Sequence, residues 1–349
     1  MDQHHRAPAV MKQWVLRNAG TFDGLKLESA HLPQISDFDV LVKIHAASLN
    51  YRDLMIAKKT YYWPVEDGRV LVSDFAGEVF NVGPKVTRFV RGDRVAGCVH
   101  QTHVAGVLTE KDAAQALGAL LDGGLREYGI FREEGLVRIP NNLSFREGAT
   151  LPCAALTAWN ALYGGKPLRP GDIVLTLGTG GVSLFGVQFA RVGGAEVIST
   201  TSSDDKAVVL RKLGARHVIN YREDGEWGQT AKKLSNGGRG ADYVLEISGP
   251  NTLEQSALAA TMDGTIARIG TRGGNQSGTA ILPHTSFANT RRIVIGSRIQ
   301  FEEMNRAIEV NDIHPVIDQR VFGFQEVPEA FQYLWDQKAV GKVVIDICS

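Results

Sequence analysis

Short runs of alternating hydrophobic and polar residues fill the first part of the chain. They are bounded by Gly, Pro, Asn and Asp, which are typical turn residues. Alternation with a period of two is typical of strands that bury one face. The pattern predicts a small β-rich domain over residues 12–150, with strands at 13–20, 39–50, 77–86, 92–100 and 134–140.

An alanine-rich stretch at 109–124 interrupts this pattern. Thr109 is a suitable helix N-cap and the two glycines at 123–124 are a suitable stop, so a surface insertion beside a cleft is expected. His100 and His103 lie in the same region. A mobile imidazole there can act as an acid near neutral pH, but a solvent-exposed pair without a chemical role is more common.

Beyond Pro140 the pattern changes. Ser144 can cap a turn, and a helix is expected at 156–163. Apolar strands and helices then take turns, which indicates a parallel sheet covered on both faces. The sequence therefore predicts an α/β fold with a doubly wound domain over residues 151–300. Its strands are expected at 172–177, 195–201, 217–221, 241–248, 265–270 and 292–299, and its helices at 184–194, 206–215 and 252–262.

The C-terminal part, residues 301–349, has a predicted helix at 329–336 and a last strand at 341–347. Because no helix follows this strand, we expect it to return and pair with the N-terminal β domain. That domain would then be discontinuous, comprising 12–150 and 301–349. Residues 1–11 would form a flexible extension.

Composition narrows the class of protein. A chain of 349 residues is long enough for two domains, each with its own core. Lys and Arg together number 38, as do Asp and Glu, so neither nucleic acid nor a membrane is an expected partner. The longest apolar runs fall far short of the roughly 20 residues that a membrane helix needs. The expected partner is a small-molecule substrate.

The cysteines and the N-terminus bear on the compartment. Cys98, Cys153 and Cys348 are widely separated, which argues against disulfides and against a CxxC zinc site. Residues 1–10 lack the features of a secretory signal or transit peptide. Both observations favour a cytoplasmic protein.

A glycine-rich turn joins the strand at 172–177 to the following helix. Gly178, Gly180 and Gly181, followed by Val182, let the backbone approach a pyrophosphate, whose charge is favoured at a helix N-terminus. Ser183 stands where a third glycine is usual, which is a mild departure. Such turns also occur without ligands, but the strand–turn–helix context favours dinucleotide binding.

The next strand ends without the Asp or Glu that commonly binds the ribose of NAD. Thr201 and Ser202 leave room for a 2′-phosphate, Lys206 supplies positive charge, and Tyr221 can cover the adenine ribose. These residues favour NADPH. Alternatively, the serines only cap the next helix, and NADH binds as well if an aspartate at 204–205 turns to the ribose.

Several segments, in order along the chain, resemble the medium-chain dehydrogenase/reductase superfamily, in particular its zinc-free quinone-oxidoreductase-like and alcohol-dehydrogenase-like members. The resemblance covers nearly everything from Lys12 onward. It implies a GroES-like catalytic domain, built from the N-terminal part and the C-terminal tail, together with a Rossmann domain. The segments are 47–56, 73–83, 92–97, 151–162, 178–190 and 341–345.

The resemblance also implies that no metal is bound. Zinc-using relatives have a Cys in the motif that here occupies 50–53, a His near Ser73 and a second Cys at the position of Cys153. Only Cys153 remains, and one thiolate cannot hold a zinc ion that needs three protein ligands. Its apolar setting makes an inert thiol the expected state.

Catalytic candidates follow from the same resemblance. Asn50 takes the place of the lost zinc ligand, facing the nicotinamide, where its amide can donate to a carbonyl oxygen. Tyr61 resembles an aromatic residue of the substrate pocket and can donate a proton or stack on a planar substrate. Its neighbour Tyr62 is an equal structural possibility, and either ring can be packing alone. Thr157 resembles a threonine that contacts the nicotinamide, unless it merely lines its helix.

Further coenzyme-binding candidates lie at the ends of strands. Ser248–Gly249 and Ile269–Gly270 follow the fourth and fifth predicted strands of the doubly wound domain, whose carboxyl ends form the coenzyme crevice. Lys342 either contacts the coenzyme or ends a turn. Asp53 and Asp74 match acids of the family, and we expect them to order loops rather than to transfer protons.

The predicted function is zinc-independent, NADPH-dependent transfer of a hydride to a carbonyl or a conjugated C=C bond, with quinones and enones as leading substrates, or the reverse oxidation of an alcohol. The alternative is a nicotinamide-binding sensor or structural protein without catalysis. The apolar strand expected at 292–299 can lie at a sheet edge, and pairing there with a second copy predicts a homodimer.

Overall fold

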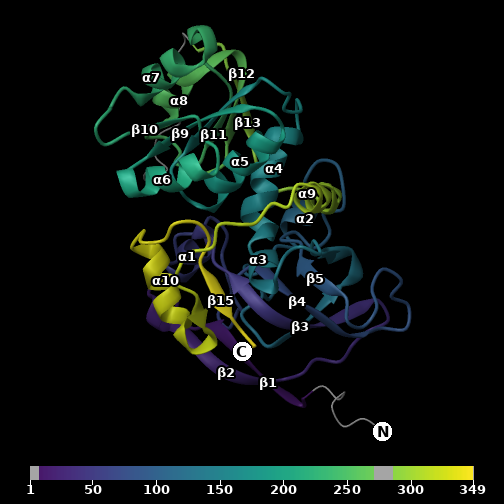
Figure 1. Cartoon of the computed structure of the whole chain (residues 1–349). Helices are drawn as coiled ribbons and strands as arrows, with labels where there is room; N and C mark the ends of the chain where they lie inside the picture. Colours follow the sequence, from purple (N-terminus) through teal and green to yellow (C-terminus); the bar gives the residue numbers. More distant parts are fainter. Residues whose placement is uncertain (1–7, 271–285, 349) are drawn as a thin grey trace. The chain divides into compact units, whose positions relative to one another are not determined.

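The computed structural model describes residues 8–270 and 286–348 (Figure 1). It divides into two compact units. Unit 1 comprises Met1–Cys153 and Ser297–Ser349, and unit 2 comprises Ala154–Gly296. The N-terminal extension expected at 1–11 lies largely outside the described residues, and the first strand begins at Val10. Within the described ranges, no helix is long and apolar enough to cross a membrane.

Unit 1 is built mainly of antiparallel strands. Its seven-stranded sheet has the order β14-β15-β3-β4-β5-β7, with β6 paired to β3, and a two-stranded sheet pairs β1 with β2. The strands are β1 Val10–Leu16, β2 Leu25–His31, β3 Asp39–Ser48, β4 Asp74–Val82, β5 Arg94–Gly97, β6 Tyr128–Arg132, β7 Leu136–Arg138, β14 Phe322–Gly323 and β15 Val344–Asp346. The helices are α1 Tyr51–Ala57, α2 Glu110–Ala113, α3 Phe145–Gly148, α9 Arg298–Val310 and α10 Val327–Trp335, with 3-10 turns at Phe22–Gly24, Glu133–Gly135 and Phe324–Glu326.

The last strand returns to the N-terminal sheet, as the sequence predicts. β15 pairs antiparallel with β3, and Val344 lies opposite Ser48. The pairing extends beyond the strand ends, because the Leu49 N–H donates to the carbonyl of Val343 over 3.0 Å. This pairing places Lys342, in the C-terminal segment, next to the point where β3 ends and α1 begins.

The prediction of a surface insertion between Cys98 and Tyr128 is wrong in its main features. Thr109 does cap a helix, accepting a hydrogen bond from the Asp112 N–H, but the helix ends at Ala113. The following segment is buried instead of exposed. It is held in the core by backbone hydrogen bonds, such as those from Gly123 N–H to Val70 O and from Gly124 N–H to Val72 O. The alanines and leucines of this segment therefore serve core packing.

Unit 2 contains a six-stranded parallel sheet with the order β10-β9-β8-β11-β12-β13. In order along the unit this is 3-2-1-4-5-6, the arrangement that places a coenzyme beyond the carboxyl ends of the strands where the order reverses. The doubly wound prediction is confirmed. The strands are β8 Ile173–Leu177, β9 Glu196–Thr201, β10 His217–Asn220, β11 Ala241–Glu246, β12 Ala260–Arg268 and β13 Asn289–Arg292.

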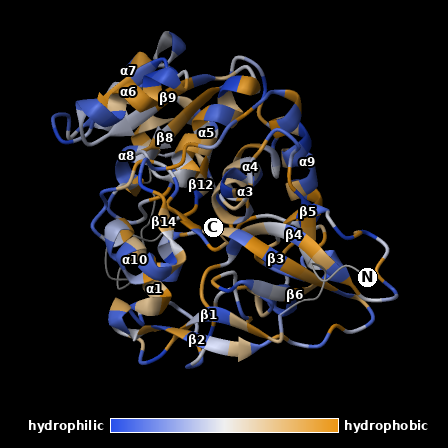
Figure 2. Ribbon diagram, turned by 60° about the horizontal axis from the view of Figure 1, so that its bottom comes forward, coloured by the Kyte–Doolittle hydropathy of each residue, from blue (hydrophilic) through white to orange (hydrophobic). Residues whose placement is uncertain are grey.

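Helices cover both faces of this sheet because successive side chains of a strand point to opposite faces. Ile173, Leu175 and Leu177 share a core with Trp227 of α7 and Leu253 of α8. On the other face α5 lies on β8 and β9, and it packs against α4. Figure 2 shows β8 largely in hydrophobic colours and α7 largely in hydrophilic ones. The helices are α4 Leu156–Tyr163, preceded by a π-helical turn at Leu151–Ala155, α5 Gly181–Val192, α6 Asp204–Lys212, α7 Trp227–Leu234 and α8 Leu253–Ala259, with a 3-10 turn at Asn236–Gly238.

The strand expected at 292–299 is misplaced. The edge strand β13 is Asn289–Arg292, and the chain leaves the sheet after it. Ser297 then begins α9, because its hydroxyl accepts a hydrogen bond from the Gln300 N–H while the Gln300 side chain accepts one from the Ser297 N–H. This Ser-x-x-Gln capping box is a helix signal that the apolar run before it obscured.

Candidate active site

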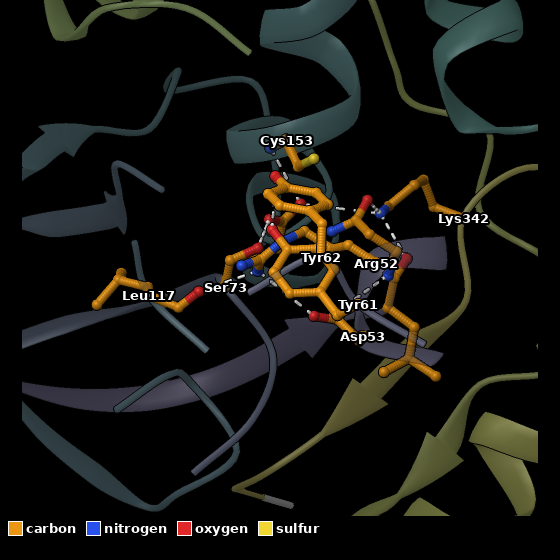
Figure 3. Close-up of polar contacts among 11 residues, drawn as sticks. Arg52, Asp53, Tyr61, Tyr62, Ser73, Leu117, Cys153 and Lys342 are labelled. Atoms are coloured by element: carbon orange, nitrogen blue, oxygen red, sulfur yellow. Dashed lines mark hydrogen bonds and ion pairs between the residues drawn. The ribbon is translucent and has the colours of Figure 1, made fainter. Parts of the chain in front are cut away.

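Two groups of polar residues stand out, one in each unit. In unit 1, five charged or amide side chains gather where β3 gives way to α1 (Figure 3). We call them the polar cluster: Asn50, Arg52, Asp53, Asp74 and Lys342. Asp74 begins β4 and Lys342 precedes β15. Both lie far from residues 50–53 in the sequence, and only the fold brings them close.

Asn50 is the N-cap residue of α1. The turn into the helix is stabilised because Oδ2 of Asp53 accepts a hydrogen bond from the Asn50 N–H over 2.8 Å. The Asp53 side chain is fully buried. Burial raises the pKa of this carboxyl to about 6, although Arg52 and the Asn50 N–H oppose the rise. Asp53 therefore orders the helix start, in the role expected from the sequence.

Lys342 is only 3% exposed, and its ammonium is held by two acceptors. Nζ donates to the carbonyl of Leu49 and to Oδ1 of Asn50, each over 2.6 Å, and it lies 3.8 Å from Oδ2 of Asp74. Its backbone forms a bridge with Ile317. The contact with Asn50 was not expected from the sequence, and a coenzyme contact stays a prediction.

The amide nitrogen of Asn50 is buried and makes no well-formed hydrogen bond to a described residue, although the amide approaches the Asp74 carboxyl closely enough to lower its pKa. Nearby Asp74 has its oxygens bonded to the Ser73 hydroxyl at 2.8 Å and to the Cys153 N–H at 3.1 Å. Burial raises the pKa of Asp74, while Lys342 and the Asn50 amide oppose the rise. An unsatisfied buried donor costs about 1–3 kcal/mol, so Asn50 Nδ2 is a donor that an acceptor from outside the chain can satisfy.

Arg52 connects the polar cluster to the two tyrosines. Its Nη1 donates to the Leu117 carbonyl over 2.9 Å and lies 3.6 Å from Oδ1 of Asp53. The guanidinium carbon lies 5.5 Å from the centre of the Tyr61 ring, a cation–π contact. Burial lowers the pKa of Arg52, but Tyr61 and Asp53 outweigh it and the pKa is raised overall. The Tyr61 hydroxyl donates to the Tyr62 hydroxyl over 2.9 Å, and Tyr62 is 65% exposed.

The environment of Cys153 disfavours a nucleophile at neutral pH, and the environment of His100 disfavours an acid. Burial raises the pKa of the Cys153 thiol to about 12, which supports the expected inert thiol. His100 and His103 are buried, each 6% exposed, so the prediction of a solvent-exposed pair is wrong. Burial and the charge of Arg52 lower the pKa of His100 to about 4. An acid near neutral pH at His100 is therefore also excluded.

The polar cluster does not fit a zinc ion. The Lys342 ammonium already supplies a cation beside Asn50 and Asp74, and the Arg52 guanidinium lies beside Asp53. Zinc needs deprotonated nitrogen, sulfur or oxygen ligands in a tetrahedral arrangement. Across residues 8–270 and 286–348, no group of three or more His, Cys, Asp and Glu residues could hold a metal.

In unit 2, the glycine-rich turn between β8 and α5 fits a dinucleotide. Gly178 has a φ of +74°, in the left-handed region that favours glycine. A Cβ at Gly180 would point into open space, so the backbone at the helix N-terminus is accessible. The N–H groups of Gly181 and Val182 in the first turn have no intrahelical partner and can bind an anion.

Ser183 and Gly186 explain the missing third glycine. Ser183 is fully buried, and its hydroxyl donates to the carbonyl of Leu177 over 2.6 Å. A Cβ at Gly186 would lie 2.5 Å from Cδ2 of Leu245. The glycine that permits close packing of α5 on the sheet is thus Gly186, one turn further along the helix.

The remaining predicted coenzyme residues lie at the carboxyl ends of the strands or next to them. Thr201 ends β9 and accepts the Tyr221 N–H over 3.0 Å, which brings these two positions together. Ser202 follows directly, and Lys206 is in the first turns of α6. Thr157 is buried within α4.

Glu246 is a residue of this crevice that sequence reasoning missed. Its buried Oε1 accepts hydrogen bonds from the N–H groups of Ser248 and Gly249 over 2.8 and 2.9 Å. The loop after β12 joins the same arrangement, because Ile269 and Gly270 donate to the Glu246 carbonyl, and a Cβ at Gly270 would strike the carbonyl oxygen of Ile247. The available signal was the charged Glu246 within the strand expected at 241–248, directly after the apolar residues 243–245.

Known proteins resemble the chain over nearly its whole length. Residues 36–141 match the family model of the alcohol dehydrogenase GroES-like domain, and residues 181–311 match that of the zinc-binding dehydrogenase. The zinc-type alcohol dehydrogenase-like protein C1773.06c of Schizosaccharomyces pombe is 44% identical over 334 residues, covering 93% of this chain and 96% of that protein. The chain belongs to the medium-chain dehydrogenase/reductase superfamily. The resemblance seen in the sequence is confirmed, and so is the pairing of a GroES-like with a Rossmann fold.

Other members of the superfamily show its range of reactions. The 2-methylene-furan-3-one reductase of Solanum lycopersicum is 30% identical, covering 97% of this chain and 79% of that protein. A solved NAD-dependent alcohol dehydrogenase has a TM-score of 0.87 and 30% identity, covering 97% of this chain and all of that one. The 2-octenoyl-CoA carboxylase reductase CinF, solved with NADP and 2-octenoyl-CoA, has a TM-score of 0.85 and 25% identity over 98% of this chain and 88% of that one. The chain is an oxidoreductase of this superfamily.

The pKa of Asp53 predicts a pH dependence of stability. Between its unfolded value of 3.8 and its folded value of about 6, the folded chain keeps a proton that the unfolded chain has lost. The resulting stabilisation is present at low pH and is lost as the pH rises through 6. From pH 5 to pH 7.5 the wild type should lose about 1–1.5 kcal/mol of unfolding free energy relative to Asp53→Asn, as measured by urea denaturation.

Asp67→Asn is the matched control. Asp67 is exposed, and the Asn18 N–H and Arg17 lower its pKa, so its removal should not reproduce the Asp53 effect. Equal free-energy differences between the wild type and Asp53→Asn at the two pH values would contradict the assignment. The titration of His100 contributes equally to the unfolding free energy of the wild type and of Asp53→Asn, so it cancels in their difference.

Proposed function

We propose that the chain is an NADPH-dependent reductase that transfers a hydride to a carbonyl or a conjugated C=C bond without a metal, with quinones and α,β-unsaturated ketones as its leading substrates. The oxidation of an alcohol is the same step in reverse. The observation that carries this proposal is the buried Nδ2 of Asn50, which makes no well-formed hydrogen bond to a described residue, on an amide whose oxygen is bonded to a buried ammonium. By the family resemblance, Asn50 takes the place of a metal ligand of zinc-using relatives. A hydrogen-bond donor backed by positive charge can stabilise an oxygen that gains electrons during reduction.

Unit 2 binds the coenzyme in this proposal. The N–H groups at the start of α5 hold the pyrophosphate, and Glu246 fixes the loop of Ser248 and Gly249 beside the carboxyl end of β11. A nicotinamide coenzyme supplies the hydride when it is bound. Lys206 and the hydroxyls of Thr201 and Ser202 favour a 2′-phosphate, which supports NADPH over NADH.

Unit 1 supplies the polar groups for the substrate. Asn50 donates a hydrogen bond to the substrate oxygen, and Tyr61 donates a proton to the reduced substrate or stacks on it. The buried Arg52 cation beside the ring stabilises the phenolate that proton donation leaves. The tomato reductase and CinF act, by their names and ligand, on unsaturated carbonyl compounds, which supports a conjugated C=C bond as the reducible group.

The proposed activity is tested by following absorbance at 340 nm with NADPH or NADH and panels of enones, quinones and aldehydes. Oxidation of NADPH with at least one enone or quinone is expected. Lys206→Glu should raise the KM for NADPH about tenfold or more and leave that for NADH nearly unchanged, because only the 2′-phosphate meets the lost charge. Lys212→Glu, at the opposite end of α6, is the control. Coenzyme binding without turnover of any compound would instead support the sensor alternative.

Tyr61 and Tyr62 can be separated by removing one hydroxyl at a time. Tyr61→Phe should lower kcat by about 10- to 100-fold if Tyr61 donates the proton. Tyr62→Phe should change kcat by less than about threefold, because Tyr62 is 65% exposed and its hydroxyl accepts the hydrogen bond that Tyr61 donates. Steady-state kinetics with the best enone measure both effects, and equal losses in the two variants would argue against Tyr61 as the proton donor.

We also propose a homodimer formed through β13, the edge strand of the unit 2 sheet. No other strand of the described residues pairs with its outer edge, so its backbone groups can pair with the same strand of a second copy. Sedimentation at about twice the chain mass of 38.0 kDa is expected. A particle of one chain mass at micromolar concentration would contradict this edge pairing.

A further inference from the structure

Lys342 and Asp74 lie at opposite ends of the Asn50 amide. The ammonium contacts Oδ1 at 2.6 Å, and the amide also lies close enough to the buried carboxyl of Asp74 to act on its ionisation. Leu49 supplies the second acceptor for Nζ at 2.6 Å, so the ammonium is tied to the turn that carries Asn50. The three side chains come from three distant parts of the sequence.

We propose that Lys342 is a positioning residue for the reaction: it fixes the Asn50 amide with Oδ1 inward, so that Nδ2 is presented to the substrate oxygen with a positive charge behind it. This inference rests on the proposed function. It assigns Lys342 a role through Asn50 rather than through direct contact with coenzyme or substrate.

The orientation of the amide follows from the chemistry of its neighbours. An ammonium has three N–H donors and no acceptor, so only the oxygen of the amide can face it. The flipped amide would place its own N–H groups against the ammonium and its oxygen toward the Asp74 carboxylate. Both contacts would be repulsive, and the two charges together hold one orientation.

The ammonium also affects the strength of the donor. Lys342 is almost fully buried, and charges in such surroundings are poorly screened by water. A cation bonded to the amide oxygen draws electron density from the amide nitrogen and strengthens the Nδ2–H donors, as expected for linked hydrogen bonds in the interior. When the substrate oxygen gains negative charge during reduction, this polarised donor and the charge behind it stabilise it more than they stabilise the neutral substrate.

Two other roles are possible for a buried lysine here. It could serve only as a counter-ion to Asp74, 3.8 Å away, or it could bind the coenzyme directly. The counter-ion role predicts a loss of stability without a specific loss of kcat. The coenzyme role predicts weaker nucleotide binding that does not depend on Asn50.

The decisive experiment is a double-mutant cycle with Lys342→Met and Asn50→Ala. Lys342→Met should lower kcat about 100-fold while the Kd for NADPH, measured by fluorescence titration, changes less than about threefold. In the Asn50→Ala background the same substitution should lower kcat by less than about threefold further. Lys338→Met, an exposed lysine paired with Asp336, is the control and should leave kcat unchanged.

Multiplicative losses in the cycle, or a rise of more than about tenfold in the Kd for NADPH with kcat unchanged, would overturn the proposal. Lys342→Arg keeps the cation and should retain at least about tenfold more kcat than Lys342→Met. If Lys342→Met does not fold, Lys342→Arg still tests the proposal through the Asn50→Ala cycle, since any effect of the longer cation should also disappear in that background.

A second measurement does not depend on turnover. The side-chain NH₂ signals of Asn50 in an amide NMR spectrum can be assigned by their loss in Asn50→Asp. Their hydrogen exchange should be slow in the wild type and at least about tenfold faster in Lys342→Met, because the amide loses its fixed orientation. Lys342→Arg, which keeps a cation, should exchange more slowly than Lys342→Met. Unchanged exchange would overturn the positioning role. Faster exchange in a protein that reduces no compound would leave the positioning role standing and refute the proposed function.

Discussion

The hydrogen bond between Lys342 and Asn50 depends on one constraint, the antiparallel pairing of β15 with β3. These residues are 292 positions apart, and only the return of the C-terminal strand brings the ammonium to the start of α1. Once there, the ammonium compensates the buried carboxyl of Asp74 and orients the Asn50 amide. A buried cation without these acceptors would be strongly unfavourable. The discontinuity of unit 1 is therefore what allows these charged side chains to meet within it.

In unit 2, contacts within loops and between neighbouring strands position the predicted coenzyme residues. Parallel strands place their carboxyl ends on one side, and the order of the six strands sets where a dinucleotide binds. Gly178 provides the left-handed turn and Gly186 the close helix packing, while Ser183 ties the helix start to β8. Glu246 then fastens the loop after β11 with its buried carboxylate. Each contact is local or between neighbouring strands.

This difference explains which features the sequence could predict. The glycine turn, the doubly wound parallel sheet and the return of the last strand follow from local patterns and from the family resemblance. The partners of Lys342 and the burial of His100 depend on long-range pairing, and no periodicity reveals them. The alanine-rich stretch was misread because alanine suits both a surface helix and a tightly packed core segment. β13 was displaced because the apolar run at 293–296 resembles a strand, whereas its neighbours Asn289–Arg292 are polar.

The central claim is that fixed protein charges and donors, and not a metal, stabilise the reacting oxygen. Its most direct test is the reduction of an enone by protein treated with a strong chelator and shown by elemental analysis to hold less than about 0.1 zinc per chain. The account predicts the same kcat before and after treatment. Loss of activity on chelation, with recovery on adding zinc, would contradict it.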